Sequence, residues 1–182
     1  MRKLFGLGTM LIAALGLITP ASIAAESDVK DLTASVPSAE CKVTCVDPHT
    51  NCKESEKVLE VLETLVKAIN NGDWKTYGDN LDEHCTTFDE SNHKLISGRE
   101  SVVLDMKSRV EKYEHQGAPF VSVCIDQPYA QVTGDTAVVT FVAIRQYGGK
   151  HPFKEEAHAT DVFLRQGDSW KKCHFRGAWK RV

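Results

Sequence analysis

The chain lacks any concentrated block of basic residues, which argues against a nucleic-acid partner. Its 22 Lys and Arg are set against 25 Asp and Glu, so the formal net charge at pH 7 is -3. A protein that grips the phosphate backbone needs a dense positive surface, because most of its affinity comes from pairing with phosphates. We therefore expect no nucleic acid among its partners.

A glycine-rich phosphate loop and an internal repeat are also missing, which excludes the common nucleotide-binding and solenoid architectures. The seven histidines are scattered, without the i, i+4 pairing of a helical zinc site. His158 and His174 fall on neighbouring predicted strands and could meet, but surface or core positions are favoured for them. We predict neither a metal site nor a cofactor.

Long apolar runs are absent except at the N-terminus. There Arg2 and Lys3 precede about 15 apolar residues, and Pro20 and a small-residue string ending in Ala24-Ala25 follow. This order is typical of a secretory signal peptide, which we expect to be cleaved after Ala24 or Ala25. A membrane anchor is the alternative, but the run is short for roughly 30 Å of hydrocarbon. The sequence thus predicts a secreted or periplasmic protein without a membrane partner after cleavage.

The length of 182 residues allows one domain with a substantial core plus appendages. Residues 1–25 are predicted to be the signal peptide. Residues 26–54 are polar, contain two prolines and show no sustained period, so we predict a cysteine-containing linker or arm. Residues 55–182 are predicted to form the domain.

Six cysteines in an exported chain make disulfides chemically permissible. Cys41, Cys45 and Cys52 crowd the segment before the domain in a spacing that fits no zinc pattern. A local disulfide from Cys41 or Cys45 to Cys52 is the preferred hypothesis. Because three is an odd number, one of these cysteines could instead pair with a domain cysteine or another chain. The remaining three lie singly in predicted strands, where small buried hydrophobes are favoured: Cys85, Cys124 and Cys173.

Helical periodicity begins sharply after Ser55, which we predict to be the N-cap. The apolar residues that follow recur at three- and four-residue spacing and draw one stripe: Val58, Leu62, Leu65, Val66 and Ile69. Asn70-Asn71-Gly72 ends the helix in the usual left-handed way. A second short helix is predicted from Asp73 to about Leu81, and a third from Gly98 to Tyr113.

Strand periodicity takes over in the C-terminal half. Cys85 to Phe88 is a short strand candidate that precedes the third helix. The later alternating segments run from Phe120 to Asp126, Pro128 to Thr133, Ala137 to Tyr147, Phe153 to Arg165, and Ser169 to about Arg181. Helices followed by an antiparallel meander predict an α+β fold with the helices on one face of the sheet, and exclude a parallel βαβ enzyme.

Several short sequence motifs define the fold more closely. They are Ala68-Ile69-Asn70-Asn71-Gly72-Asp73-Trp74 with Tyr77, Thr87-Phe88, Gly98-Arg99-Glu100, Gln146-Tyr147, Thr160-Asp161-Val162-Phe163, and Trp170 with His174-Phe175. Together they resemble the association (hub) domain of calcium/calmodulin-dependent protein kinase II, within the nuclear transport factor 2-like, SnoaL-like superfamily. The resemblance covers roughly Glu56 to Gly177. It implies a cone of three N-terminal helices packed on a curved antiparallel sheet, with a pocket inside.

In that family the domain assembles into rings and tethers kinase domains. This chain shows neither a kinase domain nor a calmodulin-binding segment, so the tethering role does not carry over. The resemblance implies a module that forms a homo-oligomer, either a dimer or a ring, and together with the signal peptide it leads us to expect an exported, non-catalytic protein. It also implies that the module binds a small ligand or a partner.

Strand alternation decides which side chains face the cone. One strand turns Val139, Phe141, Ala143, Arg145 and Tyr147 to one face, and the next turns Ala157, Ala159, Asp161 and Phe163. The resemblance places pocket arginines at the positions of Ala143 and Asp161, and both are missing here. Since a buried charge is costly unless it is paired, we predict that Arg145 and Asp161 pair across adjacent strands. The alternative is that both sit on a wet pocket rim.

The predicted pocket residues are aromatic or charged, although aromatics at helical spacing often only fill a core. They are Trp74, Tyr77, Phe88, Phe141, Arg145, Asp161, Phe163 and His174.

The alternative function is a SnoaL-like or ketosteroid-isomerase-like enzyme that performs acid–base chemistry on a small carbonyl substrate. Asp161 would be the base, Tyr77 the donor and His174 a second acid or base. No motif fixes these roles, and an arginine beside Asp161 would lower its pKa, so catalysis is the less favoured reading.

Overall fold

The structure is a computed structural model that describes residues 52–182. Its elements in chain order are α1 (Cys52–Asn70), α2 (Trp74–Asp79), β1 (Leu81–Phe88), β2 (Leu95–Ser97), α3 (Arg99–Glu111), the short 3-10 helix η1 (Glu114–Gln116), β3 (Phe120–Thr133), β4 (Thr136–Tyr147), β5 (Phe153–Gln166) and β6 (Ser169–Arg181). The predicted signal peptide, nearly all of the predicted arm, and Cys41 and Cys45 lie outside the described residues.

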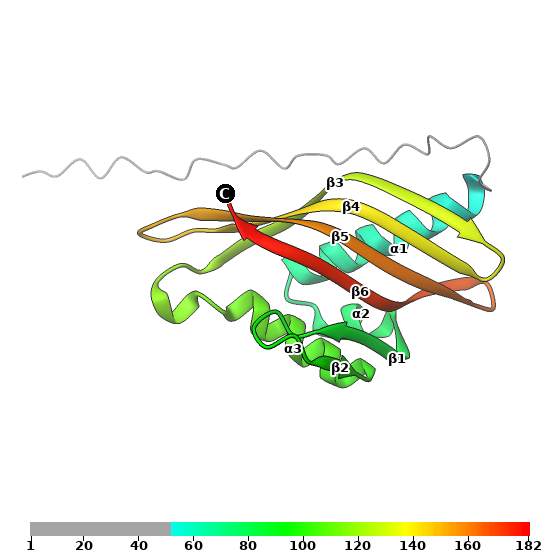
Figure 1. Cartoon of the computed structure of the whole chain (residues 1–182), viewed down its shortest axis with the longest axis horizontal. Coiled ribbons are helices and arrows are strands. Elements are labelled where there is room, and N and C mark those ends of the chain that lie inside the picture. Colours follow the sequence, from blue (N-terminus) through cyan, green and yellow to red (C-terminus); the bar gives the residue numbers. More distant parts are fainter. Residues whose placement is uncertain (1–51) are drawn as a thin grey trace, which may run out of the picture. The chain divides into compact units, whose positions relative to one another are not determined.

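The strands form one sheet in the order β2-β1-β6-β5-β4-β3. Strands β3 to β6 pair antiparallel in chain order, and β1 joins β6 in parallel. Figure 1 shows this sheet curving, with α1 lying along one face and α3 against β1 and β2. The predicted α+β fold with its antiparallel meander is confirmed. None of the described helices is both long and apolar enough to cross a membrane.

The first helix begins at Cys52, so the prediction that Ser55 is its N-cap is wrong. Ser55 lies inside the first turns, where its Oγ donates to the Ala130 carbonyl at 3.4 Å and ties α1 to β3. The end of the helix is as predicted, since Gly72 takes a φ of 64° that glycine adopts without strain. The predicted apolar stripe is buried at Val58, Leu62 and Leu65.

The other elements begin or end at residues different from those predicted, because pairing between strands outweighs the local sequence pattern. Leu81 belongs to β1 and not to the second helix, since β1 extends along β6 with Leu81 opposite Lys172. The two strands predicted between Phe120 and Thr133 are one strand, β3, with an irregularity between Asp126 and Tyr129. The sequence pattern did not predict β2, a three-residue strand that adds to β1.

The core lies between α1 and the inner face of the sheet. The five largest fully buried side chains of the domain come from five elements: Trp170 from β6, Tyr77 from α2, Tyr147 from β4, Phe163 from β5 and Leu62 from α1. The three domain cysteines lie on strands, as predicted. Cys85 is a buried free thiol on β1 whose pKa is raised to about 12 by burial, and Cys173 is a half-buried free thiol on β6. Cys124 is half-buried on β3.

Asn70 fastens the end of α1 to the edge of the sheet. Its side-chain amide donates to the Val123 carbonyl at 2.9 Å, and its Oδ1 accepts from the Val123 N–H at 2.7 Å. Because β3 is an edge strand, backbone groups that point away from β4 need such a partner. Asn70 therefore substitutes for a missing neighbouring strand at this point.

We predict that Asn70→Ala lowers the free energy of unfolding by about 1–2 kcal/mol, because two hydrogen bonds are lost at once. Asn71→Ala, one residue further in the exposed turn, is the matched control and should change little. Urea denaturation of the three proteins measures both values. Equal losses for the two variants would show that the contact to β3 does not hold α1.

Candidate functional site

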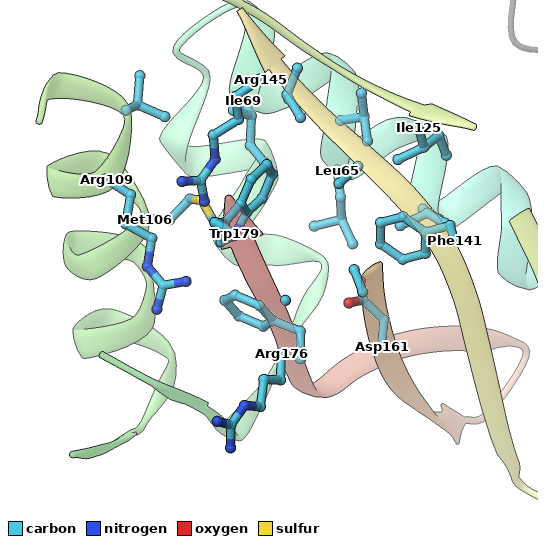
Figure 2. A pocket seen from close by; sticks show the side chains of 18 of the residues that line it. Leu65, Ile69, Met106, Arg109, Ile125, Phe141, Arg145, Asp161, Arg176 and Trp179 are labelled. Atoms are coloured by element: carbon cyan, nitrogen blue, oxygen red, sulfur yellow. The ribbon is translucent and has the colours of Figure 1, made fainter. Parts of the chain in front are cut away.

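A cavity of about 70 Å³ lies between α1, α3 and the inner face of the sheet. That space is enough for a few waters, since a cavity needs roughly 10–15 Å³ to hold one. Most of its wall is apolar, with Leu65, Ile69, Ile125 and Phe141 among the lining residues. Figure 2 shows these side chains around the hollow, together with charged groups that reach it from several elements. The charged lining residues are Arg109, Arg145, Asp161, Lys172 and Arg176.

At one part of the wall, Asp161 and Lys172 form a buried ion pair. Lys172 Nζ lies 2.8 Å from Asp161 Oδ2, and the two side chains are 6% and 4% exposed. The ammonium also lies 4.8 Å from the centre of the Phe175 ring, within cation–π range. Burial alone would lower the pKa of Lys172, but the Asp161 carboxylate raises it above its ordinary value. Lys172 is therefore an ammonium at neutral pH and no nucleophile.

A second ion-pair network is centred on Glu90, in the turn after β1. Glu90 Oε1 accepts from Arg145 Nη2 at 2.8 Å and from Arg109 Nη1 at 3.0 Å. Arg145 also lies 3.7 Å from Glu155, and its guanidinium stacks 3.6 Å above the Trp179 ring. Burial raises the pKa of Glu90, yet Arg145 and Arg109 outweigh it and hold the pKa below the ordinary value. This carboxylate therefore links α3, β4 and the turn.

The predicted pair of Arg145 with Asp161 is wrong, and strand register is the reason. Arg145 stands opposite Glu155, whereas Asp161 stands opposite Val139. The strand from Val139 to Arg145 is roughly 20 Å long at the usual rise per residue. Both side chains do line the same cavity, so the predicted face is right although each has a different partner.

Sequence reasoning missed the two true partners, Glu90 and Lys172. Glu90 lies in an irregular turn where no periodicity tells where a side chain points. Lys172 faces inward because the β5–β6 register shifts between Val162 and Phe163, which breaks the simple alternation along β6. A one-residue shift of this kind moves every following side chain to the other face. No pattern in the printed sequence marks that shift.

Only part of the predicted pocket set lines the cavity. Phe141, Arg145 and Asp161 do. Trp74 and Phe163 belong to the hydrophobic core. Phe88 lines an adjoining cleft of about 490 Å³, which shares Arg109, Arg176 and Trp179 with the cavity and so forms an approach to it.

Of the three residues considered for acid–base catalysis, only Asp161 lines the cavity. Asp161 is held by Lys172. Tyr77 is fully buried in the core, its hydroxyl has no hydrogen-bond partner among the described residues, and burial raises its pKa to about 12. His174 lies at the seam between β1 and β6, where its Nδ1 is 2.8 Å from Thr86 Oγ1. This geometry does not favour the enzyme alternative.

The histidines do not gather either. His158 stands opposite Ala178 on β6, whereas His174 stands opposite Val162 on β5, so these two do not meet across the strands. In the range 52–182 no group of three His, Cys, Asp or Glu side chains is arranged to hold a metal ion.

Comparison with known proteins gives consistent matches. The family model described as calcium/calmodulin dependent protein kinase II association domain matches residues 54–178. The delta subunit of calcium/calmodulin-dependent protein kinase type II from Oryctolagus cuniculus is 25% identical over 142 residues, which cover 76% of this chain but only 26% of that kinase.

Solved structures show the same fold. The hub of the S. rosetta kinase superposes with a TM-score of 0.57 at 24% identity, covering 76% of this chain and 100% of the hub. A putative dehydratase of the NTF2-like family from Streptomyces avermitilis gives a TM-score of 0.57 at 20% identity, covering 69% of this chain and 94% of the other.

We predict that Glu90→Gln destabilises the protein at neutral pH by about 2–3 kcal/mol, because two buried guanidinium groups lose their shared charge. Since the pKa of Glu90 is lowered on folding, its stabilisation is complete above the ordinary Glu pKa of about 4.3 and is lost as pH falls through the lower folded value. The stability gap between wild type and variant should therefore close in acid.

Thermal unfolding followed from pH 7 down to pH 3 measures this gap. Glu83→Gln, an exposed carboxylate on β1, is the control and should show no comparable gap at any pH. A gap for Glu90→Gln that stays constant with pH would contradict the proposed charge pairing.

Proposed function

Because the chain belongs to the calcium/calmodulin dependent protein kinase II association domain family, we propose that it is an exported, non-catalytic module that assembles with copies of itself. In this proposal its inner cavity binds a small ligand. Kinase activity is not part of the proposal, since the chain corresponds to 26% of the kinase it matches.

The main observation in favour of self-association is the composition of the outer face of the sheet. Val138, Val142 and Ile144 on β4 alternate with the inward residues, and Val162 on β5 lies beside Val138. Among the described residues, α1 covers the opposite face, the one that lines the cavity. Polar residues of the same face, Thr140, His158 and Thr160, lie among these apolar side chains. An antiparallel sheet with one face in water normally shows mainly polar side chains there, so the apolar residues on this mixed face favour contact with another subunit. The solved neighbour from S. rosetta is itself named a hub.

The non-catalytic part of the proposal rests on the pairing inside the cavity. The one carboxylate that reaches it from β5, Asp161, is held by the Lys172 ammonium 2.8 Å away, so taking a proton from a substrate would disrupt that ion pair. Burial outweighs the ammonium and raises the pKa of Asp161, so the argument against catalysis is this pairing and not a low basicity. A hollow with an apolar wall and a few fixed polar groups is instead typical of a binding site. Export is supported by the order of charged, apolar and small residues at the N-terminus.

We predict that the wild-type protein has the mass of a multi-subunit assembly in solution, and that Val142→Lys weakens this assembly at least about tenfold. A lysine there stands opposite Asp126 and is tolerated in the isolated sheet, but burying it in an interface costs several kcal/mol. Size-exclusion chromatography with light scattering across a dilution series gives the subunit number.

Leu104→Lys is the matched control, because Leu104 on α3 is 67% exposed and lies away from the outer sheet face. It should leave the assembly intact. A wild-type protein that is monomeric at every concentration would remove self-association, and equal weakening by both variants would remove the assignment to this face.

We also predict that the chain, produced with its own N-terminus in a secreting host, is recovered outside the cytoplasm with Ala25 or Glu26 as its first residue. Intact-mass spectrometry of the exported fraction identifies that residue. Leu11→Arg interrupts the apolar run and should leave the uncleaved precursor inside the cell. A wild-type precursor that stays uncleaved in the cytoplasm would contradict export.

A further inference from the structure

The charges that reach the cavity are balanced by partners of opposite sign. Lys172 is paired with Asp161. Arg145 is paired with Glu90 and lies near Glu155, and Arg109 is paired with Glu90 and Asp105. The remaining charged lining residue, Arg176, is exposed and lies 5.0 Å from the centre of the Phe88 ring, on the side of the adjoining cleft. Each charged lining residue other than Arg176 thus already has a partner of opposite sign.

This balance decides what kind of ligand can enter. A carboxylate placed beside the Asp161–Lys172 pair would add a second negative charge, and an ammonium would add a second positive one. Either leaves one uncompensated charge in an apolar enclosure, which costs several kcal/mol. Arg145 is not open to an anion, because Glu90 already occupies its guanidinium edge and Trp179 covers its face.

The Asp161–Lys172 pair nevertheless keeps unused hydrogen-bonding capacity. Asp161 Oδ2 is buried without an aligned hydrogen-bond donor among the described residues, although Lys172 Nζ is 2.8 Å away. A carboxylate offers about four lone-pair sites and an ammonium three donors. An acceptor and a donor with spare capacity therefore stand side by side at the cavity wall, where Figure 2 shows Asp161 facing Leu65 and Phe141.

We propose that the cavity binds a small neutral molecule with a short apolar tail and one polar head that both donates and accepts, such as a primary carboxamide. Its N–H group donates to the Asp161 carboxylate, and its carbonyl accepts from the Lys172 ammonium. The tail lies against Leu65, Ile69 and Phe141. This proposal deepens the small-ligand part of the proposed function and rests on it.

The size of the ligand follows from the volume. A cavity of about 70 Å³ has room for only a few water-sized groups, so the ligand must be very small, on the order of six heavy atoms at most. Butyramide, butyrate and butylammonium are close in size and differ in the charge of the head. They form a matched set of probes that separates charge from shape.

The test is titration of the mature, assembled protein at pH 7 with each probe, followed by calorimetry or ligand-observed NMR. We expect butyramide to bind at least about tenfold more tightly than butyrate or butylammonium, which corresponds to about 1.4 kcal/mol. Butyrate binding more tightly than butyramide would overturn the proposal, and so would butylammonium doing so.

Two variants locate the binding. Ala143→Leu fills the cavity and should abolish butyramide binding, whereas Ala178→Leu, exposed on β6, should leave it unchanged. The double variant Asp161→Leu with Lys172→Met removes the polar pair without changing the net charge of the cavity wall, a replacement that folded proteins often tolerate. This double variant should bind butyramide about tenfold more weakly, or worse, and should bind the three probes with similar affinity.

The outcomes separate this inference from self-association. If the protein assembles but none of the three probes binds, the ligand proposal falls and the assembly proposal stands. If the protein is monomeric and still prefers butyramide, the ligand proposal stands and self-association falls. Unchanged butyramide binding in Ala143→Leu would also overturn the assignment to this cavity.

Discussion

The rest of the structure depends on the neutralisation of charges on the hollow face of the sheet. A curved sheet that closes over a helix buries the side chains of its inner face, and here those side chains include Arg145, Asp161 and Lys172. An isolated charge in such a place is unstable, so each one needs a partner within a few ångströms. Lys172 supplies it for Asp161, and the Glu90 turn supplies it for Arg145. The packing of the turn, α3 and β6 around the cavity is therefore coupled to electrostatics.

This constraint also bears on function. Residues that are paired with one another are less available to a ligand or substrate. Asp161 is held by Lys172, although burial raises the pKa of its carboxyl, and Glu90 occupies the guanidinium edge of Arg145. The same pairing leaves a small cavity with a mostly apolar wall, whose buried charges already have partners. The outer face of the sheet, with Val138, Val142 and Ile144, shows the complementary property, since its apolar side chains have no helix over them among the described residues. The proposed ligand site and the proposed subunit interface thus lie on opposite faces of the same strand.

The predictions that were right concern features set by residues close together in the sequence, and those that were wrong concern contacts between distant segments. Three features were predicted correctly because they depend on neighbours a few residues away in the sequence. They are the buried helix face of Val58, Leu62 and Leu65, the left-handed helix end at Gly72, and the alternation along β4. The N-cap at Ser55 failed because a hydroxyl that suits capping serves equally well in a contact to a distant carbonyl, that of Ala130. The limits of β1 failed because its partner is β6, at the other end of the domain.

By itself the sequence determined the α+β order, the antiparallel meander, the family, and the fact that Arg145 and Asp161 face inward, since periodicity and local sequence words carry that information. Only the tertiary structure decided which charges pair. The partner of Asp161 depends on a register shift between β5 and β6. The partner of Arg145 is Glu90, which lies in the turn after β1, before α3 in the sequence. Both ion pairs depend on how segments far apart in the sequence pack together. Side-chain periodicity repeats within a single helix or strand, so it does not predict that packing.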